Sequence, residues 1–293
     1  EVTLLPCTIR VDGDSEMDSL ASSLGLSGDG SEGNPYLMEG IDIDASGSPG
    51  AVYIGNVSSH LVISDCDLGN AAAGQGEYHS GAALMLYNSP HVRVEDSRLW
   101  GSEAGLVILD CQEVRVEGNR ITGNSVGIRA EGSSGGVLTQ NLVEDSSSFG
   151  VELISCSACQ VYGNLFLGNN PGGGQATDDS SNLWNSSEMG NHWDDHTGPD
   201  GDGDGVVDDP YQAGEGTDHL PLSGPVGPPW GLNALRTSEG VELAWSTSNY
   251  SLHTSVTSQR IYRNLSGEIT LLDSLSAGTT SYLDTCPASD EIG

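Results

Sequence analysis

The sequence predicts an all-β solenoid for the central part of the chain, because residues 91–170 repeat themselves. The repeat is roughly 22 residues long, as in EVRVEGNRITGNSVGIRAEGSSG, and such a period indicates stacked coils. Within each unit, short runs alternate apolar and polar residues, as at Val114, Val116 and Ile121, and Gly, Asn and Ser interrupt the runs. A period of two is typical of strands.

Two columns of equivalent residues run through the repeats. Glycines open equivalent strands: Gly81, Gly105, Gly127 and Gly150. Small polar residues end a second set of equivalent strands: Cys66, Ser97, Asn119, Asn141 and Asn164. A stacked Asn can bond the backbone of the next coil, so we expect an interior ladder at a tight turn.

These repeats resemble the right-handed parallel β-helix repeats of NosD-like proteins and of the carbohydrate-binding and sugar-hydrolase superfamily. The resemblance covers roughly residues 40–185 and implies a right-handed parallel β-helix. It does not imply one function, since that fold carries lyases, hydrolases, adhesins and scaffolds. We expect the β-helix to span residues 41–185.

The charge of the chain is strongly negative. Its 42 acidic residues face nine basic ones, all of them Arg, and the formal net charge is −33. Phosphate binding needs the opposite sign, which argues against a nucleic-acid partner. The self-repulsion calls for salt or divalent cations, as in a calcium-loaded surface protein or a protein from a saline habitat.

Several features favour a secreted or surface location. No apolar run is long enough to span a membrane, and the chain begins at Glu1 as if a signal peptide had been removed. Four glycosylation sequons occur: Asn56, Asn185, Asn249 and Asn264.

Six cysteines suit an oxidising compartment. Cys111 and Cys156 share a column two coils apart, roughly 9–10 Å at sheet spacing, so we expect no bond between them. Cys156 and Cys159 flank a short CSAC turn, which predicts a local disulfide or two buried thiols. Cys7 could pair with Cys66, and Cys286 has no evident partner.

Residues 1–40 are predicted to be an N-terminal cap and entry segment. A strand lies in residues 3–13, followed by a short amphipathic helix in residues 15–26, with Ser15 as candidate N-cap and Gly25 as its end. The apolar face comprises Met17, Leu20, Ala21 and Leu24. Such a helix would cover the open end of the β-helix.

Two faces of the coils are candidate binding surfaces. Outward arginines suggest a platform for an anionic polysaccharide, or alternatively ladders with neighbouring Glu residues: Arg93, Arg98, Arg115 and Arg120. An apolar stripe suggests docking of a domain or subunit: Met85, Val107, Leu109 and Ile154. An insertion between Leu68 and Ser80 could also bind, or be a solvated bulge.

No catalytic constellation is evident. Asp65 and Asp96 share a column, but the third member of that column is Gly118. His60 and His91 begin successive coils, where a stacked pair is more often structural than catalytic. The sequence therefore favours a protein that is not an enzyme, although β-helix active sites are assembled from several coils.

Residues 186–222 carry the sharpest chemical signal, the acidic run that starts at Asp200. Alternating Asp residues with Gly205 at the sixth position can turn their oxygens onto one calcium ion. The expected ligands are Asp200, Asp202, Asp204, the Val206 carbonyl, Asp208 and Asp209. The run departs from an EF-hand because its twelfth residue is Tyr211, and it resembles the loops of dockerins and thrombospondin-type repeats. The segment also resembles the tail of archaeal β-helix surface proteins.

A rival hypothesis concerns the HWDDH stretch. His192, His196 and His219, with Asp194 and Asp195, could hold a transition metal, and NosD-like proteins are linked to copper. Soft Cu(I) prefers Met and Cys ligands, of which only Met189 is near in sequence. We therefore expect Trp193 and its neighbours to cap the last coil instead.

A Pro-rich linker at residues 223–230 precedes a second domain. Residues 231–293 resemble a fibronectin type III module, with Trp245 in the second strand, Tyr262 in the third and Tyr282 before the corner. The match covers about five of the usual seven strands. Either the natural chain continues, or a neighbouring subunit supplies the missing strands.

The sequence thus predicts a secreted calcium-binding β-helix with a fibronectin-like module, acting as a structural or adhesive component that self-associates into a surface layer or filament. The alternative is a protein that binds or cleaves polysaccharide, with the arginines and the Leu68–Ser80 loop as its groove.

Overall fold

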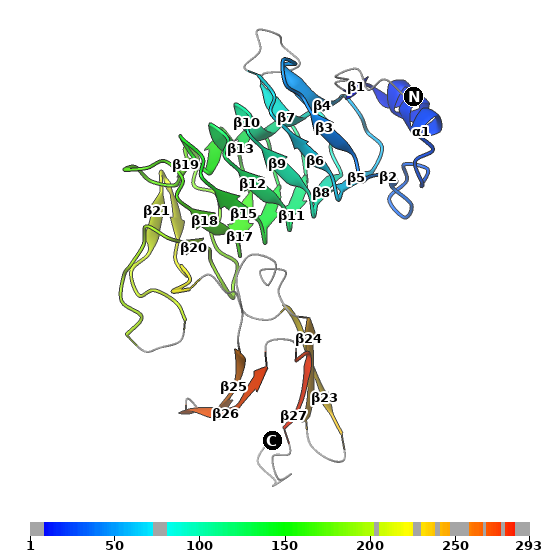
Figure 1. Cartoon of the computed structure of the whole chain (residues 1–293). Helices are drawn as coiled ribbons and strands as arrows, with labels where there is room; N and C mark the ends of the chain where they lie inside the picture. The colour runs from blue at the N-terminus through cyan, green and yellow to red at the C-terminus, as the bar shows by residue number, and fades with distance from the viewer. Residues whose placement is uncertain are drawn as a thin grey trace. The chain divides into compact units, whose positions relative to one another are not determined.

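The computed structural model describes residues 9–72, 81–201, 205–224, 230–237, 241–246, 258–265, 268–276 and 279–284. The chain divides into two compact units, Glu1–Ser223 and Gly224–Gly293 (Figure 1).

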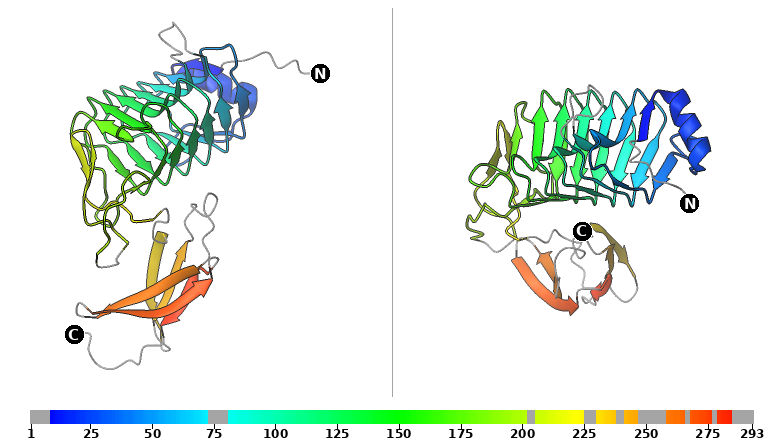
Figure 2. Two further views of the ribbon diagram at one scale, coloured as in Figure 1. Left: turned by 60° about the vertical axis from the view of Figure 1, so that its left-hand side comes forward. Right: turned by 45° about the horizontal axis from the view of Figure 1, so that its top comes forward.

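The first unit is a parallel β-helix of the right-handed type, in which each coil adds one strand to each of three sheets (Figures 1 and 2). The first sheet contains β1 (Ile9–Asp12), β4 (Gly50–Gly55), β7 (Ala82–Tyr87), β10 (Ala104–Leu109), β13 (Val126–Glu131), β16 (Val151–Ile154) and β19 (Ala176–Asp178). The second contains β2 (Tyr36–Glu39), β5 (Leu61–Ser64), β8 (Val92–Glu95), β11 (Arg115–Glu117), β14 (Val137–Thr139) and β17 (Gln160–Tyr162). The third contains β3 (Asp42–Asp44), β6 (Asp67–Gly69), β9 (Arg98–Trp100), β12 (Arg120–Thr122), β15 (Leu142–Glu144), β18 (Leu165–Leu167) and β20 (His192–Trp193).

The core of the coils is filled by short aliphatic side chains, as the alternation predicts. Val94, Val116, Leu138 and Val161 stack in register along the second sheet, and each is at most 2% exposed. The inward positions of the other two sheets are filled in the same way. One or more apolar side chains from each strand therefore bury their area against the coils on either side.

The predicted asparagine ladder lies at the corner between the second and third sheets. Oδ1 of Asn119 accepts the backbone N–H of Ser97, and Oδ1 of Asn141 accepts that of Asn119, both at 3.0 Å. Oδ1 of Asn164 likewise accepts the backbone N–H of Asn141 at 3.0 Å. The Nδ2 of Asn141 donates to the Val116 carbonyl at 2.9 Å. Each corner N–H, which the sheets leave unpaired, thus receives an acceptor from the following coil.

Glycine is required where successive strands of the first sheet begin. A Cβ at Gly105 would lie 2.7 Å from the Gly127 carbonyl oxygen, and one at Gly127 would collide with the Gly150 carbonyl. For Gly105, Gly127 and Gly150, the predicted glycine column therefore reflects close backbone approach between coils. Gly81 lies outside this column, because Ala83 is the residue of β7 that is in register with Gly105.

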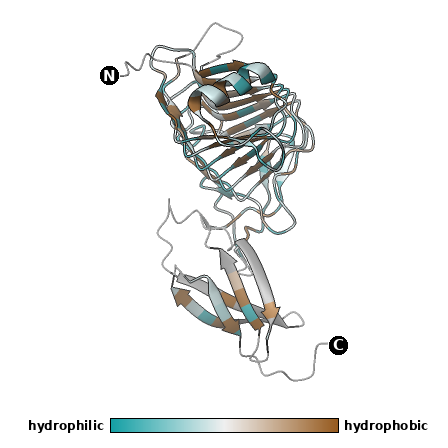
Figure 3. Ribbon diagram, turned by 90° about the vertical axis from the view of Figure 1, so that its right-hand side faces the viewer, coloured by the Kyte–Doolittle hydropathy of each residue, from teal (hydrophilic) through white to brown (hydrophobic). Residues whose placement is uncertain are grey.

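The predicted helix is present as α1 (Asp14–Leu24) and lies across the N-terminal end of the coils (Figures 1 and 3). Met17 and Ala21 are buried, and Gly25 ends the helix with φ 67°. Two details differ from expectation. Gly13, not Ser15, is the N-cap residue, and Leu24 is 51% exposed.

The N-terminal start of α1 is shifted because Asp14 binds the coil beneath. Its Oδ1 accepts the backbone N–H of Ser58 and its Oδ2 accepts the Ser58 hydroxyl, both at 2.7 Å. The Gly13 carbonyl accepts the N–H of Met17 at 3.1 Å, so the N-cap lies two residues earlier than expected. Asp14 therefore fixes the cap to the second coil.

The second unit contains two small antiparallel sheets. β23 (Trp230–Arg236), β24 (Val241–Ser246) and β27 (Ser281–Asp284) form one, and β25 (Ser258–Leu265) pairs with β26 (Glu268–Ser276) in the other. Trp245, Tyr262 and Tyr282 lie in β24, β25 and β27. This arrangement is compatible with a fibronectin type III-like sandwich, which stays a prediction.

We predict that Asn141→Ala destabilises the β-helix by about 1–3 kcal/mol, because it leaves the buried N–H of Asn119 without an acceptor and removes the side-chain donor to the Val116 carbonyl. Urea unfolding followed by circular dichroism measures the loss. Gln112→Ala, at an exposed position of a nearby corner, should change stability by less than about 0.5 kcal/mol. Equal effects of the two substitutions would contradict the ladder.

We also predict an acid-dependent loosening of α1. The Ser58 hydroxyl and N–H hold the pKa of the Asp14 carboxyl below its usual value of 3.8. The contribution of Asp14 is therefore fully present above roughly pH 4, and it is lost as the pH falls through the depressed folded-state pKa. Hydrogen exchange of the α1 amides should accelerate only below that pH in the wild type, but should already be fast at pH 7 in Asp14→Ala.

Ser22→Ala, on the exposed side of α1, is the control for this experiment and should retain wild-type protection at pH 7. If Asp14→Ala were equally protected, Asp14 would not be what attaches the cap.

Candidate functional site

The C-terminal end of the β-helix is closed by a stack of aromatic rings. Trp193 in β20 is 1% exposed and lies between Phe166 of β18, with ring centroids 4.3 Å apart, and Tyr211, at 4.0 Å. Tyr211 begins a hairpin of β21 (Tyr211–Ala213) and β22 (Gly216–Asp218). The prediction that Trp193 caps the last coil agrees with this geometry.

The same cap ends three corner ladders of the solenoid. The asparagine ladder passes from Asn164 to Asn191, whose N–H donates to Oδ2 of the buried Asp218 at 2.7 Å. In the second ladder, Oδ1 of Asn182 accepts the N–H of Cys159, and the N–H of Asn182 donates to Oδ2 of Asp178 at 2.6 Å. The third ladder lies at the corner between the third and first sheets and ends on a neutral residue. There the N–H of Asn169 donates to Oε1 of Gln175 at 3.2 Å. Each ladder thus ends on an acceptor that needs no further coil.

The two terminal carboxylates are buried but well supplied with donors. The indole of Trp193 donates to Asp218, and the indole of Trp184 donates to Asp178, each at 3.0 Å. Burial raises the pKa of Asp218 above its usual value, against the effect of its hydrogen bonds. Sequence reasoning missed both residues, because they lie beyond the repeat, where no periodic pattern marks them.

The HWDDH side chains belong to this cap. Nδ1 of His192 donates to the Leu222 carbonyl at 3.0 Å, and Nε2 of His196 to the Asp209 carbonyl at 2.7 Å. Burial lowers the pKa of His192. Gln175 donates to both Asp194 and Asp195 at 2.8 Å, while His219 is exposed.

The acidic loop is joined to the cap by backbone hydrogen bonds. The N–H of Val207 donates to the Pro221 carbonyl at 2.7 Å, and the N–H of Ser223 to the Gly205 carbonyl at 2.9 Å. Within the loop, the N–H of Asp208 donates to the Pro199 carbonyl at 2.8 Å. The loop is therefore closed at its base and attached to the segment that follows the cap hairpin.

Asp200 has an unusual environment in this loop. Its Oδ2 accepts the N–H of Gly205 and the hydroxyl of Ser223, each at 3.1 Å. Its Oδ1 is buried and, among the described residues, has no hydrogen-bond donor. Oδ2 of Asp208 accepts the N–H of Gly201 at 3.0 Å. Asp202 and Asp204 lie outside the described residues.

The four arginines of the candidate ligand face lie on two sheets rather than one. Arg93 and Arg115 are register partners on the second sheet, and Arg98 and Arg120 on the third. All four pair with carboxylates: Arg93 with Glu95 at 3.2 Å, Arg98 with Asp67 at 3.1 Å, Arg115 with Glu117 at 2.6 Å and Arg120 with Glu144 at 2.6 Å. These partly exposed pairs contribute little stability, but they occupy the guanidinium groups that an anionic ligand would need.

The candidate assembly face is largely covered. Met85 and Val107, which are 4% and 7% exposed, belong to a second apolar cluster with Tyr53, separate from the core. Leu109 and Ile154 are half-buried. These side chains therefore point away from the main core, as the alternation predicts. Only Leu109 and Ile154 leave part of their surface open to a partner.

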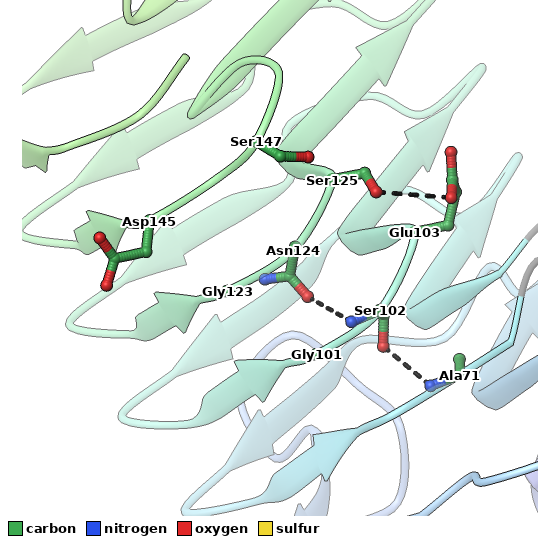
Figure 4. A pocket seen from close by; sticks show the side chains of 9 residues that line it. All are labelled: Ala71, Gly101, Ser102, Glu103, Gly123, Asn124, Ser125, Asp145 and Ser147. Carbon is green, nitrogen blue, oxygen red and sulfur yellow. Dashed lines mark hydrogen bonds between the residues drawn. The ribbon is translucent and has the colours of Figure 1, made fainter. Parts of the chain in front are cut away.

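A polar groove of about 350 Å³ crosses several coils at the corner between the third and first sheets (Figure 4). Gly101 and Gly123, which have no side chains, form part of its wall, and Glu103 and Asp145 supply its charges. Ser125 donates weakly to Glu103 at 3.5 Å. Ser102 and Asn124 line the groove as well and belong to the corner ladder beneath it.

Other candidate residues are placed as follows. Asn56 is exposed and its Nδ2 donates to Asp12 at 2.7 Å, whereas Asn185 is half-buried and bonds Ser186. Asn264 lies in β25, and Asn249 is outside the described residues. Desolvation, and then the charges of Asp65 and Glu117, raise the pKa of Asp96.

The histidine pair and the described cysteines complete the account. The rings of His60 and His91 stack 4.5 Å apart. Cys66, Cys111, Cys156 and Cys159 are buried and free, while Cys7 and Cys286 lie outside the described residues.

The fold and its cap define a parallel β-helix protein. A family model described as periplasmic copper-binding protein (NosD) matches residues 32–198, more than half of the chain. The chain belongs to the NosD family. A search of curated proteins finds no significant match to it.

Copper, which this family description names, favours imidazole or sulfur donors that converge on one point. Within the described ranges, no three His, Cys, Asp or Glu side chains gather in this way. His192 and His196 each direct one ring nitrogen to a backbone carbonyl of the cap. The described residues therefore do not fit a copper site. Nor does any described helix have the length and apolar character needed to cross a membrane.

Proposed function

We propose that this chain is a calcium-binding structural protein of the cell exterior, of a kind that resembles archaeal β-helix surface proteins. The observation that carries the proposal is Oδ1 of Asp200, a buried carboxylate oxygen with no donor among the described residues. Burying such an oxygen without a partner is costly, and a hard cation is the partner that a carboxylate prefers.

The spacing of the loop supports calcium as that cation. Asp200 occupies the first position and accepts the N–H of Gly205, the sixth, whose φ of 92° favours glycine. The proposed ligands are Asp200, Asp202, Asp204, the Val206 carbonyl, Asp208 and Asp209. The net charge of −33 favours cation binding further.

Calcium here would stabilise the end of the solenoid. The loop bonds to Pro221 and Ser223, and the adjacent Leu222 donates its N–H to Asn191 at 2.8 Å. Asn191 is the last asparagine of the corner ladder, so an ordered loop supports the residue on which that ladder depends. In this role the ion is a structural cofactor.

Self-association into a lattice or filament is the further part of this proposal. Tyr87, Leu109 and Ile154 occupy one register column on the outer side of the first sheet, with Glu131 between the last two. This narrow half-buried stripe is the contact that we propose. Glycans on Asn56 or Asn185 would suit the same exterior location.

We predict that calcium at about one hundred times its Kd raises the Tm of the β-helix by about 5–10 °C, which calorimetry measures. Asp200→Asn should abolish most of the shift, because it weakens a charged ligand. Glu188→Gln, which removes the same charge from an exposed position, should retain it. Mass photometry of the same samples should show multimers that dissociate in chelator.

Equal calcium shifts in wild type and Asp200→Asn would contradict the site. If the protein stayed a monodisperse monomer with and without calcium but still showed the calcium-dependent rise in Tm, the proposal of self-association would be wrong and the calcium site would stand.

A second candidate function is the binding or cleavage of a polysaccharide, favoured by the polar groove of Figure 4. Hydroxyl groups of a sugar can donate to Glu103 and Asp145 and accept from Ser125 and Ser147. The two carboxylates also repel uronates, so this groove suits a neutral glycan. It therefore differs from the arginine platform, which suits an acidic glycan.

We predict that, under this second function, Ser125→Phe abolishes glycan binding because the ring fills the groove, while Arg93→Ala and Arg115→Ala do not. Calorimetry with neutral and uronate-rich oligosaccharides, and analysis of products, gives the readout. Loss of binding only in the arginine variants would place the ligand on the second sheet instead.

A further inference from the structure

Two cysteines, three residues apart in the chain, lie inside one corner of the β-helix, in the turn between β16 and β17. Cys156 and Cys159 are 1% and 2% exposed, and both are free thiols that belong to the main core. The turn that separates them includes Ala158 with φ 55°, a left-handed backbone conformation at the corner between the first and second sheets. The fold, rather than a ligand, holds them together.

The two thiols interact directly. A hydrogen bond between their side chains raises the pKa of Cys156 and lowers that of Cys159, which makes Cys159 the more acidic thiol. Each sulfur also lies near a backbone carbonyl, Ile154 for Cys156 at 3.5 Å and Ser157 for Cys159 at 3.7 Å. In the coil beneath, Gly136 has no side chain, and Cys159 Sγ packs above it.

The other described cysteines lack this arrangement. Cys111 occupies the same column as Cys156 but two coils away, with Ser133 between them. Burial raises the pKa of Cys111 to about 11, so its thiol stays protonated at neutral pH. Cys66 is buried, and its sulfur lies near the carbonyls of Met38 and Ser64.

We propose that Cys156 and Cys159 form a disulfide bond when the protein is exposed to an oxidising compartment. The oxidant is a low-molecular-weight disulfide: the Cys159 thiolate attacks one of its sulfurs and releases one thiol. Cys156, after losing its proton, then attacks the sulfur of Cys159 and releases the second thiol. One disulfide is thereby reduced to two thiols, and the two cysteines lose two hydrogen atoms in total.

The bond would act as a structural staple at the corner of a coil. No helix begins at this turn, so the pair lacks the N-terminal dipole that tunes redox-active CxxC motifs. The bond would constrain the unfolded chain and fix the corner that leads from the first sheet to the second. This inference does not depend on the calcium loop.

The test uses the full chain, equilibrated with mixtures of reduced and oxidised glutathione, quenched in acid, denatured and labelled with N-ethylmaleimide. After digestion by a Glu-specific protease, the peptide that follows Glu152 contains both cysteines. In the oxidised sample it should carry no label and be two hydrogen atoms lighter. The Tm should rise by about 4–8 °C relative to the reduced protein.

Cys111→Ser should leave this result unchanged, and Cys156→Ser should abolish both the mass change and the Tm shift. The wild-type peptide decides the question even if a variant fails to fold. Full labelling of both cysteines at the most oxidising ratio, or linkage of either to another cysteine, would overturn the proposal. The calcium-dependent Tm shift would be unaffected by that failure.

Discussion

The structure depends on one hydrogen bond that recurs at the corners of the coils, from a backbone N–H to a side-chain acceptor in the next coil. Strand pairing satisfies the backbone within the three sheets, but the residues at the corners turn inward, away from both sheets and water. Asn119, Asn141 and Asn164 supply the missing acceptors at one corner. An unpaired N–H at such a site would cost about 1–3 kcal/mol, so the sequence of each corner is restricted.

This bond also explains the cap. Since each coil takes its acceptor from the following one, the end of the solenoid needs acceptors that no following coil supplies. Asp218, Asp178 and Gln175 provide it at the three ladders that reach the end. Two of these are buried carboxylates, and the indoles of Trp193 and Trp184 offset part of the cost of burying them. The aromatic stack and the acidic loop are then built around these terminal acceptors, which joins the proposed calcium site to the stability of the solenoid.

Much of the fold followed from residues that repeat. The period predicted the coils, the alternation predicted the inward residues, and the Asn and Gly columns predicted the corner ladder and the close strand starts. The predictions for the capping helix were wrong at its two ends. Ser15 looks like an N-cap, but Asp14 bonds to Ser58 of another coil and the helix starts earlier. Leu24 fits the apolar face of the helix, yet it is exposed at the C-terminal end of α1, where only Met17 and Ala21 of that face are buried.

By itself, the sequence determined the solenoid, its capping helix and the acidic loop with its calcium-like spacing, because these depend on local periodicity and on residue types close together in the chain. Only the tertiary structure showed that the arginines divide between two sheets with their charges paired, and that Asp178 and Asp218 end separate ladders. It also showed that the Cys156 and Cys159 thiols, which the spacing had placed in one turn, are both free and buried in the main core. These features depend on which side chains meet across coils and how deeply they are buried, and spacing along the chain does not specify either.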